Sequence, residues 1–181
     1  MGDDDLRLHL VVLRCQSGDE SAFATLMASF GPKTRAYLGT MVGDDGDDVQ
    51  QDVWLTVYRR IHELANPGAF RTWLFRITRH RAIDTLRRRK RERELLVEPN
   101  EEIVAGVAEE EIDEPGIDWA AMERALAGIP PAHREVLLLR YRDELSYQEI
   151  AVVVGCPLGT VRARLHHAKR KLNVLLTGGS S

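Results

Sequence analysis

Several residue types are scarce in this chain of 181 residues, and each scarcity excludes a class of protein. Only 6% of the residues are aromatic and no alternating β-branched run stands out, so we expect helices to bury the apolar 44%. No stretch approaches the roughly 20 apolar residues of a membrane span, so no membrane insertion is predicted. The two cysteines, Cys15 and Cys156, match no metal-binding spacing, which favours a reduced setting. Because Asp3, Asp4 and Asp5 are the opposite of a signal peptide's basic start, we predict a cytoplasmic protein.

Converging catalytic groups are also lacking. The sequence places neither a metal-ligand spacing nor a nucleophile around any of the histidines, which are His9, His62, His80, His133, His166 and His167. We therefore predict no catalytic residues, no metal ion and no cofactor, and we do not expect an enzyme.

Charge is present in quantity but is segregated along the chain. The formal net charge of −3 argues at first against a nucleic-acid partner. Basic residues nevertheless dominate 71–93, every charged residue in 94–118 is acidic, and 157–181 contains no acid. Basic blocks separated by an acidic one indicate DNA contacts at two places.

The N-terminal half predicts a small bundle of helices. A short helix is expected from Leu6 to Cys15, and Asp19 or Ser21 could cap a second, which the Gly31-Pro32 pair is expected to interrupt. The next helix is the clearest, because apolar residues recur every four positions and two aromatic residues flank them: Val49, Val53, Val57 and Ile61, with Trp54 and Tyr58. Asn66-Pro67-Gly68 is expected to end it. A final helix has the apolar set Phe70, Trp73, Leu74, Ile77 and Ile83.

The expected fold class is all-α, with two small helical domains joined by an acidic flexible linker. The first domain is predicted over 6–91 and the linker over 92–117, where prolines and carboxylates replace helical periodicity. The second domain, over 118–176, is expected to begin with one short helix from Trp119 and another containing Val136, Leu137, Leu138 and Tyr141.

The strongest pattern in the chain predicts a helix-turn-helix. Ser146 and Glu149 have the spacing of a capping box, and Gly155 can take the left-handed conformation of a turn. On the following helix, spacings of four, three and four predict a core face of Val161, Leu165, Ala168 and Leu172. The outward face has Arg, His and Lys and no acid, which suits the major groove and its phosphates. An ordinary helical hairpin with a solvated basic face remains an alternative.

These residues resemble the sigma-70 family, specifically its small two-domain extracytoplasmic-function (ECF) group. Five segments resemble region four of the family. They are Ile129-Pro130-Pro131, His133-Arg134-Glu135-Val136, Leu138-Leu139-Arg140-Tyr141, Leu145 to Ala151 and Gly159-Thr160-Val161-Arg162. Asp48 to Trp54 resembles the region-two helix that binds the polymerase clamp. The segment from Phe70 to Arg88 resembles the part that melts and reads the minus-ten element. The resemblance covers about residues 18–93 and 118–175.

The resemblance implies a transcription initiation factor that binds core RNA polymerase and directs promoter-specific initiation. The implied polymerase-binding residues are Asp48, Gln51, Asp52 and Trp54. The loop His62 to Ala69 would capture a flipped base, and the implied minus-ten residues are His62, Asn66, Arg76, Arg79, His80, Arg87 and Arg88. His80 stands where the family usually has asparagine, and Trp73 is assigned to the core in preference to a base platform.

The implied upstream (minus-thirty-five) residues lie on the second helix of the helix-turn-helix. They are Thr160, Arg162, Ala163, Arg164, His166, His167, Lys169 and Arg170. The implied partners are the clamp and flap regions of core RNA polymerase, promoter DNA and an anti-sigma factor.

Two other functions remain open at this point. An operator-binding helix-turn-helix regulator would explain the second domain but not the clamp-like helix or the basic segment of the first. A sigma-mimicking decoy that sequesters an anti-sigma factor could dispense with DNA-contacting arginines, yet both basic faces are present. Binding to core polymerase distinguishes the three.

Overall fold

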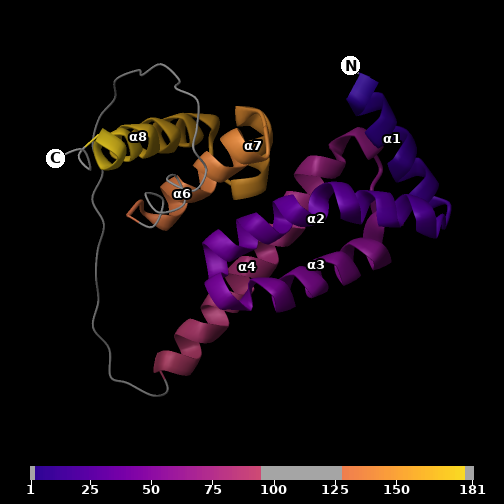
Figure 1. Ribbon diagram of the computed structural model, residues 1–181, viewed down its shortest axis with the longest axis horizontal. Coiled ribbons are helices and arrows are strands. Elements are labelled where there is room, and N and C mark those ends of the chain that lie inside the picture. Colours follow the sequence, from indigo (N-terminus) through magenta and orange to yellow (C-terminus); the bar gives the residue numbers. More distant parts are fainter. Residues whose placement is uncertain (1–2, 95–127, 178–181) are drawn as a thin grey trace. The chain divides into compact units, whose positions relative to one another are not determined.

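The computed structural model describes residues 3–94 and 128–177, which fold into helices without any strand. They form two compact units, each described here by itself (Figure 1). The N-terminal unit contains α1 (Asp3–Gln16), α2 (Glu20–Val42), η1 (Gly43–Asp45), α3 (Gly46–Arg60), η2 (Ile61–Glu63), η3 (Pro67–Ala69) and α4 (Phe70–Glu94). The C-terminal unit contains α6 (Pro131–Leu137), the π-helical turn η4 (Leu138–Arg142), α7 (Tyr147–Val154) and α8 (Leu158–Thr177). The expected all-α class is confirmed.

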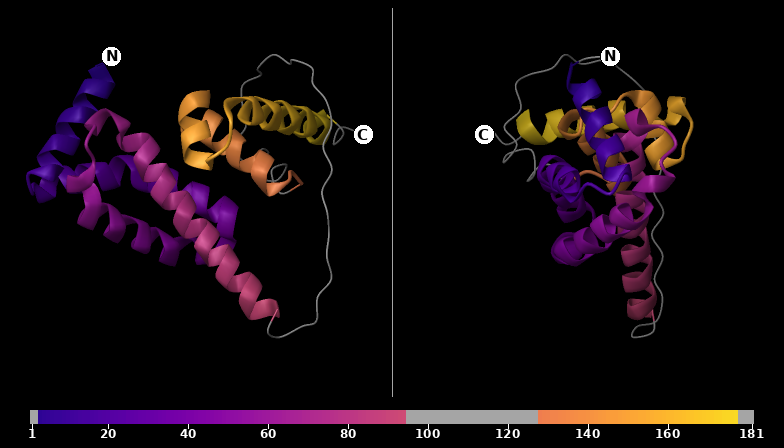
Figure 2. Two further views of the ribbon diagram at one scale, coloured as in Figure 1. Left: turned by 180° about the vertical axis from the view of Figure 1, so that it is seen from behind. Right: turned by 90° about the vertical axis from the view of Figure 1, so that its right-hand side faces the viewer.

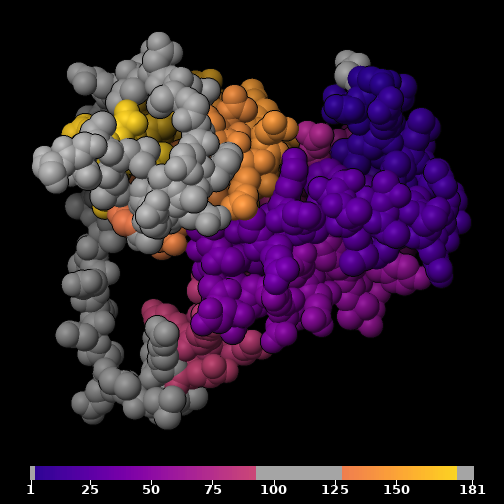
Figure 3. Space-filling view, in the orientation of Figure 1, coloured from indigo at the N-terminus to yellow at the C-terminus, as the bar shows by residue number. Residues whose placement is uncertain are grey.

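The core of the N-terminal unit lies among α2, α3 and α4, which pack against one another (Figure 2). The four-residue period of α3 is confirmed, because Val49, Val53, Val57 and Ile61 are all buried. The space-filling view shows α1 packed closely on α2, while the C-terminal part of α4 projects beyond α2 and α3 (Figures 1 and 3). The basic end of α4 is therefore largely surrounded by solvent.

Asp19 caps α2, and it is one of the two residues, Asp19 and Ser21, that the sequence offered for this position. Its Oδ1 accepts hydrogen bonds from the amides of Ser21 and Ala22 at 2.9 and 3.1 Å, and its Oδ2 pairs with Arg14 at 2.7 Å. Hydrogen bonds from Ser21, Ala22 and Arg14 hold the pKa of Asp19 well below its ordinary value. The cap thereby fixes the turn that joins α1 to α2.

The predicted break at Gly31-Pro32 is wrong, since α2 continues through both residues to Val42. Proline lacks an amide hydrogen, so the carbonyl four residues earlier, that of Ala28, loses its helical donor while the helix continues. Thr34 Oγ1 donates to the carbonyls of Phe30 and Gly31, both at 3.1 Å, and Gln50 Nε2 from α3 donates to Gly31 at 2.8 Å. Bonds within α2 and one bond from α3 therefore support the helix beside the proline, where the local pattern predicted a break.

The assignment of Trp73 to the core also needs correction, since its side chain is only half-buried, as are Ile77 and Ile83. The positions of α4 that are fully covered include the small residues Thr78 and Ala82. Thr78 Oγ1 donates to the Leu74 carbonyl at 2.9 Å, so its hydroxyl is satisfied inside the core. The large residues Phe70, Leu74 and Phe75 are buried on the same helix, and Trp73 lies at the edge of this buried side.

The C-terminal unit is built on the packing of α6 and α7 against α8. All four predicted core residues of α8 are buried, from Val161 at 0% exposed to Leu172 at 8%. Ile129 and the run Val136 to Leu139 are buried with them.

The helix expected from Trp119 and nearly all of the predicted linker lie outside the described residues, although α4 extends to Glu94. In the part that the structure describes, no helix combines the length and apolar character needed to span a membrane.

Replacing Gln50 with methionine should destabilise the protein by about 1 kcal/mol, because the Gly31 carbonyl beside Pro32 loses its donor from α3. The matched change at the adjacent, exposed Gln51 should alter stability by less than about 0.5 kcal/mol. Urea unfolding measures both variants. Equal effects would show that the bond from Gln50 does not support the continuous α2.

Candidate nucleic-acid and polymerase interfaces

The helix-turn-helix of the C-terminal unit has the local geometry that its sequence predicts. Ser146 Oγ accepts from the Glu149 amide at 3.3 Å, and the Glu149 carboxylate accepts from the Ser146 amide at 2.8 Å, which completes the capping box. Gly155 ends α7 in the left-handed conformation (φ 70°, ψ 40°). The carbonyl of Pro157 then accepts from the amides of Thr160 and Val161, so α8 begins directly after the turn.

All the predicted upstream residues lie outside the buried side of α8, but they are exposed to different degrees. Arg162 and Arg170 are exposed. The half-buried members are Thr160, Ala163, Arg164, His166, His167 and Lys169. Some of these contact the unit itself: Lys169 Nζ lies 5.1 Å from the ring centroid of Tyr141, and Arg164 Nη1 lies 3.9 Å from Cys156 Sγ. Arg162 and Arg170 are therefore the members of this set that are most accessible to a partner.

Three histidines meet where α6 packs on α8. The His133 ring lies 5.8 Å from that of His167, which in turn lies 5.8 Å from that of His166. Burial lowers the pKa of His133, and the nearby charges of His167, Arg164 and Lys171 lower it further. His133 is therefore favoured in its neutral form at this junction. Sequence reasoning gave His133 no part in this cluster, because α6 and α8 meet only in the tertiary structure.

The basic face of the N-terminal unit lies on α4. Arg76, His80, Arg87 and Arg88 are exposed, and Arg79 is half-buried. Spacings of four and seven place Arg76, His80 and Arg87 along one side of the helix. Two of the set have acidic neighbours on the same helix: His80 Nδ1 lies 3.1 Å from Asp84 Oδ2, and Arg88 Nε lies 3.9 Å from Glu92 Oε1. The face remains positively charged overall.

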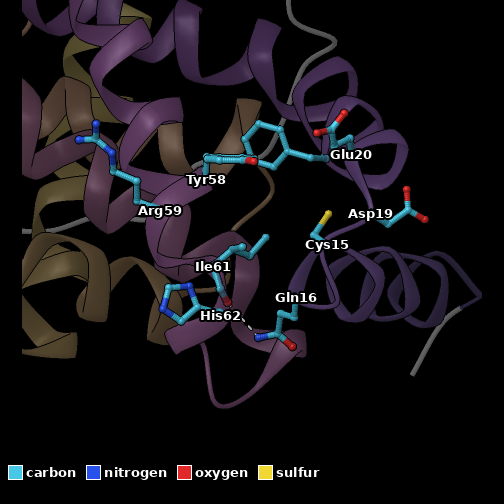
Figure 4. A pocket seen from close by; sticks show the side chains of 10 residues that line it. Cys15, Gln16, Asp19, Glu20, Tyr58, Arg59, Ile61 and His62 are labelled. Atoms are coloured by element: carbon cyan, nitrogen blue, oxygen red, sulfur yellow. Dashed lines mark hydrogen bonds between the residues drawn. The ribbon is translucent and has the colours of Figure 1, made fainter.

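The loop between α3 and α4 presents His62 and Asn66, both of which are exposed. Asn66 Oδ1 accepts from the Gly68 amide at 3.0 Å, which caps η3. The side-chain amide of Gln16 donates to the carbonyls of Ile61 and Leu64. Figure 4 shows Gln16 from α1 directed at Ile61, next to His62, at the edge of a pocket of about 340 Å³. Sequence reasoning missed Gln16, because nothing local links it to partners 45 and 48 residues away.

The predicted polymerase face on α3 needs one correction. Asp48, Gln51 and Asp52 are exposed, but Trp54 is 5% exposed and packs edge-on against Phe23 with ring centroids 5.9 Å apart. Trp54 therefore belongs to the core and cannot serve as a surface contact.

Two apolar residues take its place on that face. Leu55 is 46% exposed and Tyr58 is 56% exposed, and their spacing from Gln51 puts both on the side of α3 that carries the carboxylates. An exposed apolar residue within an acidic stripe was the signal that could have identified Leu55 from the sequence.

Comparison with known proteins identifies both units. The family model of sigma-70 region 2 matches residues 26–92, and that of sigma-70 region 4 matches residues 119–172. The two matches occur in that order and define a sigma-70-type transcription initiation factor.

Relatives specify the group within that class. The "ECF RNA polymerase sigma-E factor" of Escherichia coli K12 is 31% identical, with 94% of each chain covered. The "ECF RNA polymerase sigma factor RpoE" of Cereibacter sphaeroides is 34% identical, over 85% of this chain and 86% of the relative. The chain therefore belongs to the ECF sigma factors, which bind core RNA polymerase and direct promoter-specific initiation and are known as non-catalytic factors.

Solved structures agree on the fold. CnrH, in complex with the cytosolic domain of CnrY, is 26% identical with a TM-score of 0.68, covering 96% of this chain and 99% of its own. The sigma factor RpoE from Bartonella quintana, in complex with the anti-sigma factor NepR, is 24% identical with a TM-score of 0.69, covering 87% and 98%.

The C-terminal unit should lose stability on acidification through His133. Its pKa is lowered in the folded unit from the ordinary 6.5, so the unfolded chain binds the proton first as pH falls. The stabilisation is complete above pH 6.5 and is lost as pH falls through that value towards the pKa of the folded state. Urea unfolding at pH 7.5 and 5.5, followed by NMR signals of α6 and α8, should show a smaller decrease for His133→Gln than for the wild type. An equal decrease would contradict this role.

Proposed function

We propose that the two units divide the work of promoter recognition, with polymerase docking assigned to α3. The N-terminal domain, over 6–91, docks on the polymerase clamp through α3 and contacts the minus-ten element through α4 and the loop 62–69. The C-terminal domain, over 118–176, contacts the minus-thirty-five element through α8 and the polymerase flap, and 92–117 links the two. The observation that supports this most directly is the opposite charge of the exposed faces of α3 and α4 within one unit.

The docking surface on α3 consists of Asp48, Gln51 and Asp52 with Leu55 and Tyr58, all exposed. The carboxylates would meet a basic partner and steer its approach, while Leu55 and Tyr58 would lose their contact with water in the complex. Carboxylates followed along the helix by exposed apolar residues combine electrostatic attraction with apolar area that a partner can bury.

The DNA surfaces rely on cations whose main contribution is to phosphate binding. Arg76, Arg79, Arg87 and Arg88 on α4 would follow the backbone near the minus-ten element, and His62, Asn66 and His80 would lie beside a flipped base. On α8, Arg162 and Arg170 would lead the contacts with the upstream element, supported by Thr160, Ala163, Arg164, His166, His167 and Lys169. This face has no acid within 157–174, which suits DNA.

An anti-sigma factor is the proposed regulatory partner, and the cytoplasm is the proposed location. A solved relative of the same fold is a sigma factor bound to the anti-sigma factor NepR. A partner of this kind could act by covering α3 or α8. The protein would act through binding alone, without catalysis of its own.

Each of the two alternative functions, the operator-binding regulator and the decoy, fails to explain at least one of the exposed surfaces. An operator-binding regulator needs no acidic and apolar face on α3, and a decoy needs no arginines on α4 and α8. Run-off transcription with purified core polymerase on a promoter library tests the proposal, and unchanged template selection by the folded protein would exclude it.

Changing Asp52 to lysine should weaken binding to core polymerase about tenfold, because it reverses a charge at the proposed docking surface. Asp4→Lys makes the same charge change on the exposed side of α1 and serves as the control. Fluorescence anisotropy with labelled protein measures both affinities. Similar losses in the two variants would mean that net charge, and not the α3 surface, determines binding.

Changing Arg162 to alanine should reduce transcription from promoters that depend on the upstream element by roughly fivefold to tenfold, because a contact with DNA is lost. Affinity for core polymerase should stay unchanged. Arg7→Ala is the matched control, since it removes the same charge from an exposed position on α1 of the other unit. Equal effects of the two changes on transcription would contradict the assignment of this face.

A further inference from the structure

The loop that is proposed to read the minus-ten element is supported by a helix outside the matched region 2. The family model begins at residue 26, whereas α1 spans Asp3–Gln16. In the folded unit α1 packs against both η2 and η3, the two short turns that make up most of the loop. A segment far away in sequence therefore forms one wall of the loop.

Gln16 makes the most specific contact between them. Its Nε2 donates to the carbonyl of Ile61 at 2.9 Å and to that of Leu64 at 2.8 Å. Both acceptors are carbonyls, so only the amide nitrogen, with its two hydrogens, can occupy this position. One side chain thereby holds both ends of η2 (Figure 4).

The rest of the loop is packed closely against its surroundings. Leu64 and Pro67 are buried, and a Cβ on Gly68 would lie 3.2 Å from Asn66 Oδ1 and 3.9 Å from His9 Nδ1 of α1. The backbone is thus enclosed on the α1 side. The side chains of His62 and Asn66 remain exposed on the loop.

We propose that Gln16 is a positioning residue for minus-ten recognition, because it fixes the backbone from which His62 and Asn66 project. This inference rests on the proposed role of the loop 62–69. A base that leaves the helical stack is accepted only by groups already in place, since ordering a mobile loop at each encounter reduces affinity. Gln16 touches no DNA in this scheme and acts through the loop.

Hydrogen exchange of the full-length protein tests the first step. Gln16→Met keeps the length of the side chain but removes both donors, and Gln16→Glu turns the carboxylate oxygens towards the two carbonyls. Both changes should raise amide exchange in 64–69 about tenfold and leave exchange in α3 and α4 unchanged. Ser17→Ala is the matched control, because Ser17 Oγ donates only to the Leu13 carbonyl within the α1 end, and it should leave the loop unchanged. Unaltered exchange in 64–69 in the Gln16 variants would overturn the proposal.

Run-off transcription on promoters randomised in the minus-ten element tests the second step. In both Gln16 variants the preference between favoured and disfavoured minus-ten bases should fall about fivefold, while use of the upstream element and affinity for core polymerase stay as in the wild type. A uniform loss on all promoters, with base preference retained, would show a merely structural role and overturn the proposal. If the wild type itself shows no minus-ten preference, the proposed function fails, and with it the role of Gln16, even where hydrogen exchange shows that the loop has opened.

Discussion

Backbone carbonyls at the ends and irregularities of helices must find hydrogen-bond donors, and this requirement shapes the whole molecule. The structure meets it repeatedly with long side chains from a different element or turn. Gln50 donates to Gly31 beside the proline of α2, and Gln16 donates to both ends of η2. Arg89 donates to Val42 at the end of α2, and Arg140 donates to Leu145 before the helix-turn-helix. Each bond joins elements or turns that lie apart in the sequence and satisfies a backbone carbonyl.

Positive and negative charges nearly balance over the whole sequence, but they lie on separate surfaces of the folded units. The core side of α3 is held by its valines, so Asp48 and Asp52 are left on the outside together with Leu55. On α8 the buried apolar positions leave Arg162 and Arg170 exposed. One chain with little net charge can therefore carry an acidic surface on α3 and basic surfaces on α4 and α8, because helical periodicity separates the charges in space.

In the proposed function, the reading of a promoter base by the loop between α3 and α4 depends on residues outside the reading surface. A short loop that carries polar side chains gains precision only when its backbone is held. In this unit α1 provides that support through Gln16, while the Asp19 cap and its pair with Arg14 fix the turn after α1. The end of α1 is therefore hydrogen-bonded both to the loop and to the cap of α2.

The local sequence pattern was sufficient to predict those structural features in which the interacting residues lie only a few positions apart. The four-residue period of α3, the Ser146 and Glu149 capping box and the left-handed Gly155 follow from spacing and side-chain chemistry. The sequence alone therefore predicted that most charged residues of the proposed surfaces lie outside the core. The tertiary structure decided what depends on distant partners: α2 passes through Pro32, Trp54 is buried and Gln16 supports the loop. No local rule encodes these features, because the partners that satisfy or cover each group lie on other helices and meet it only when the bundle is packed.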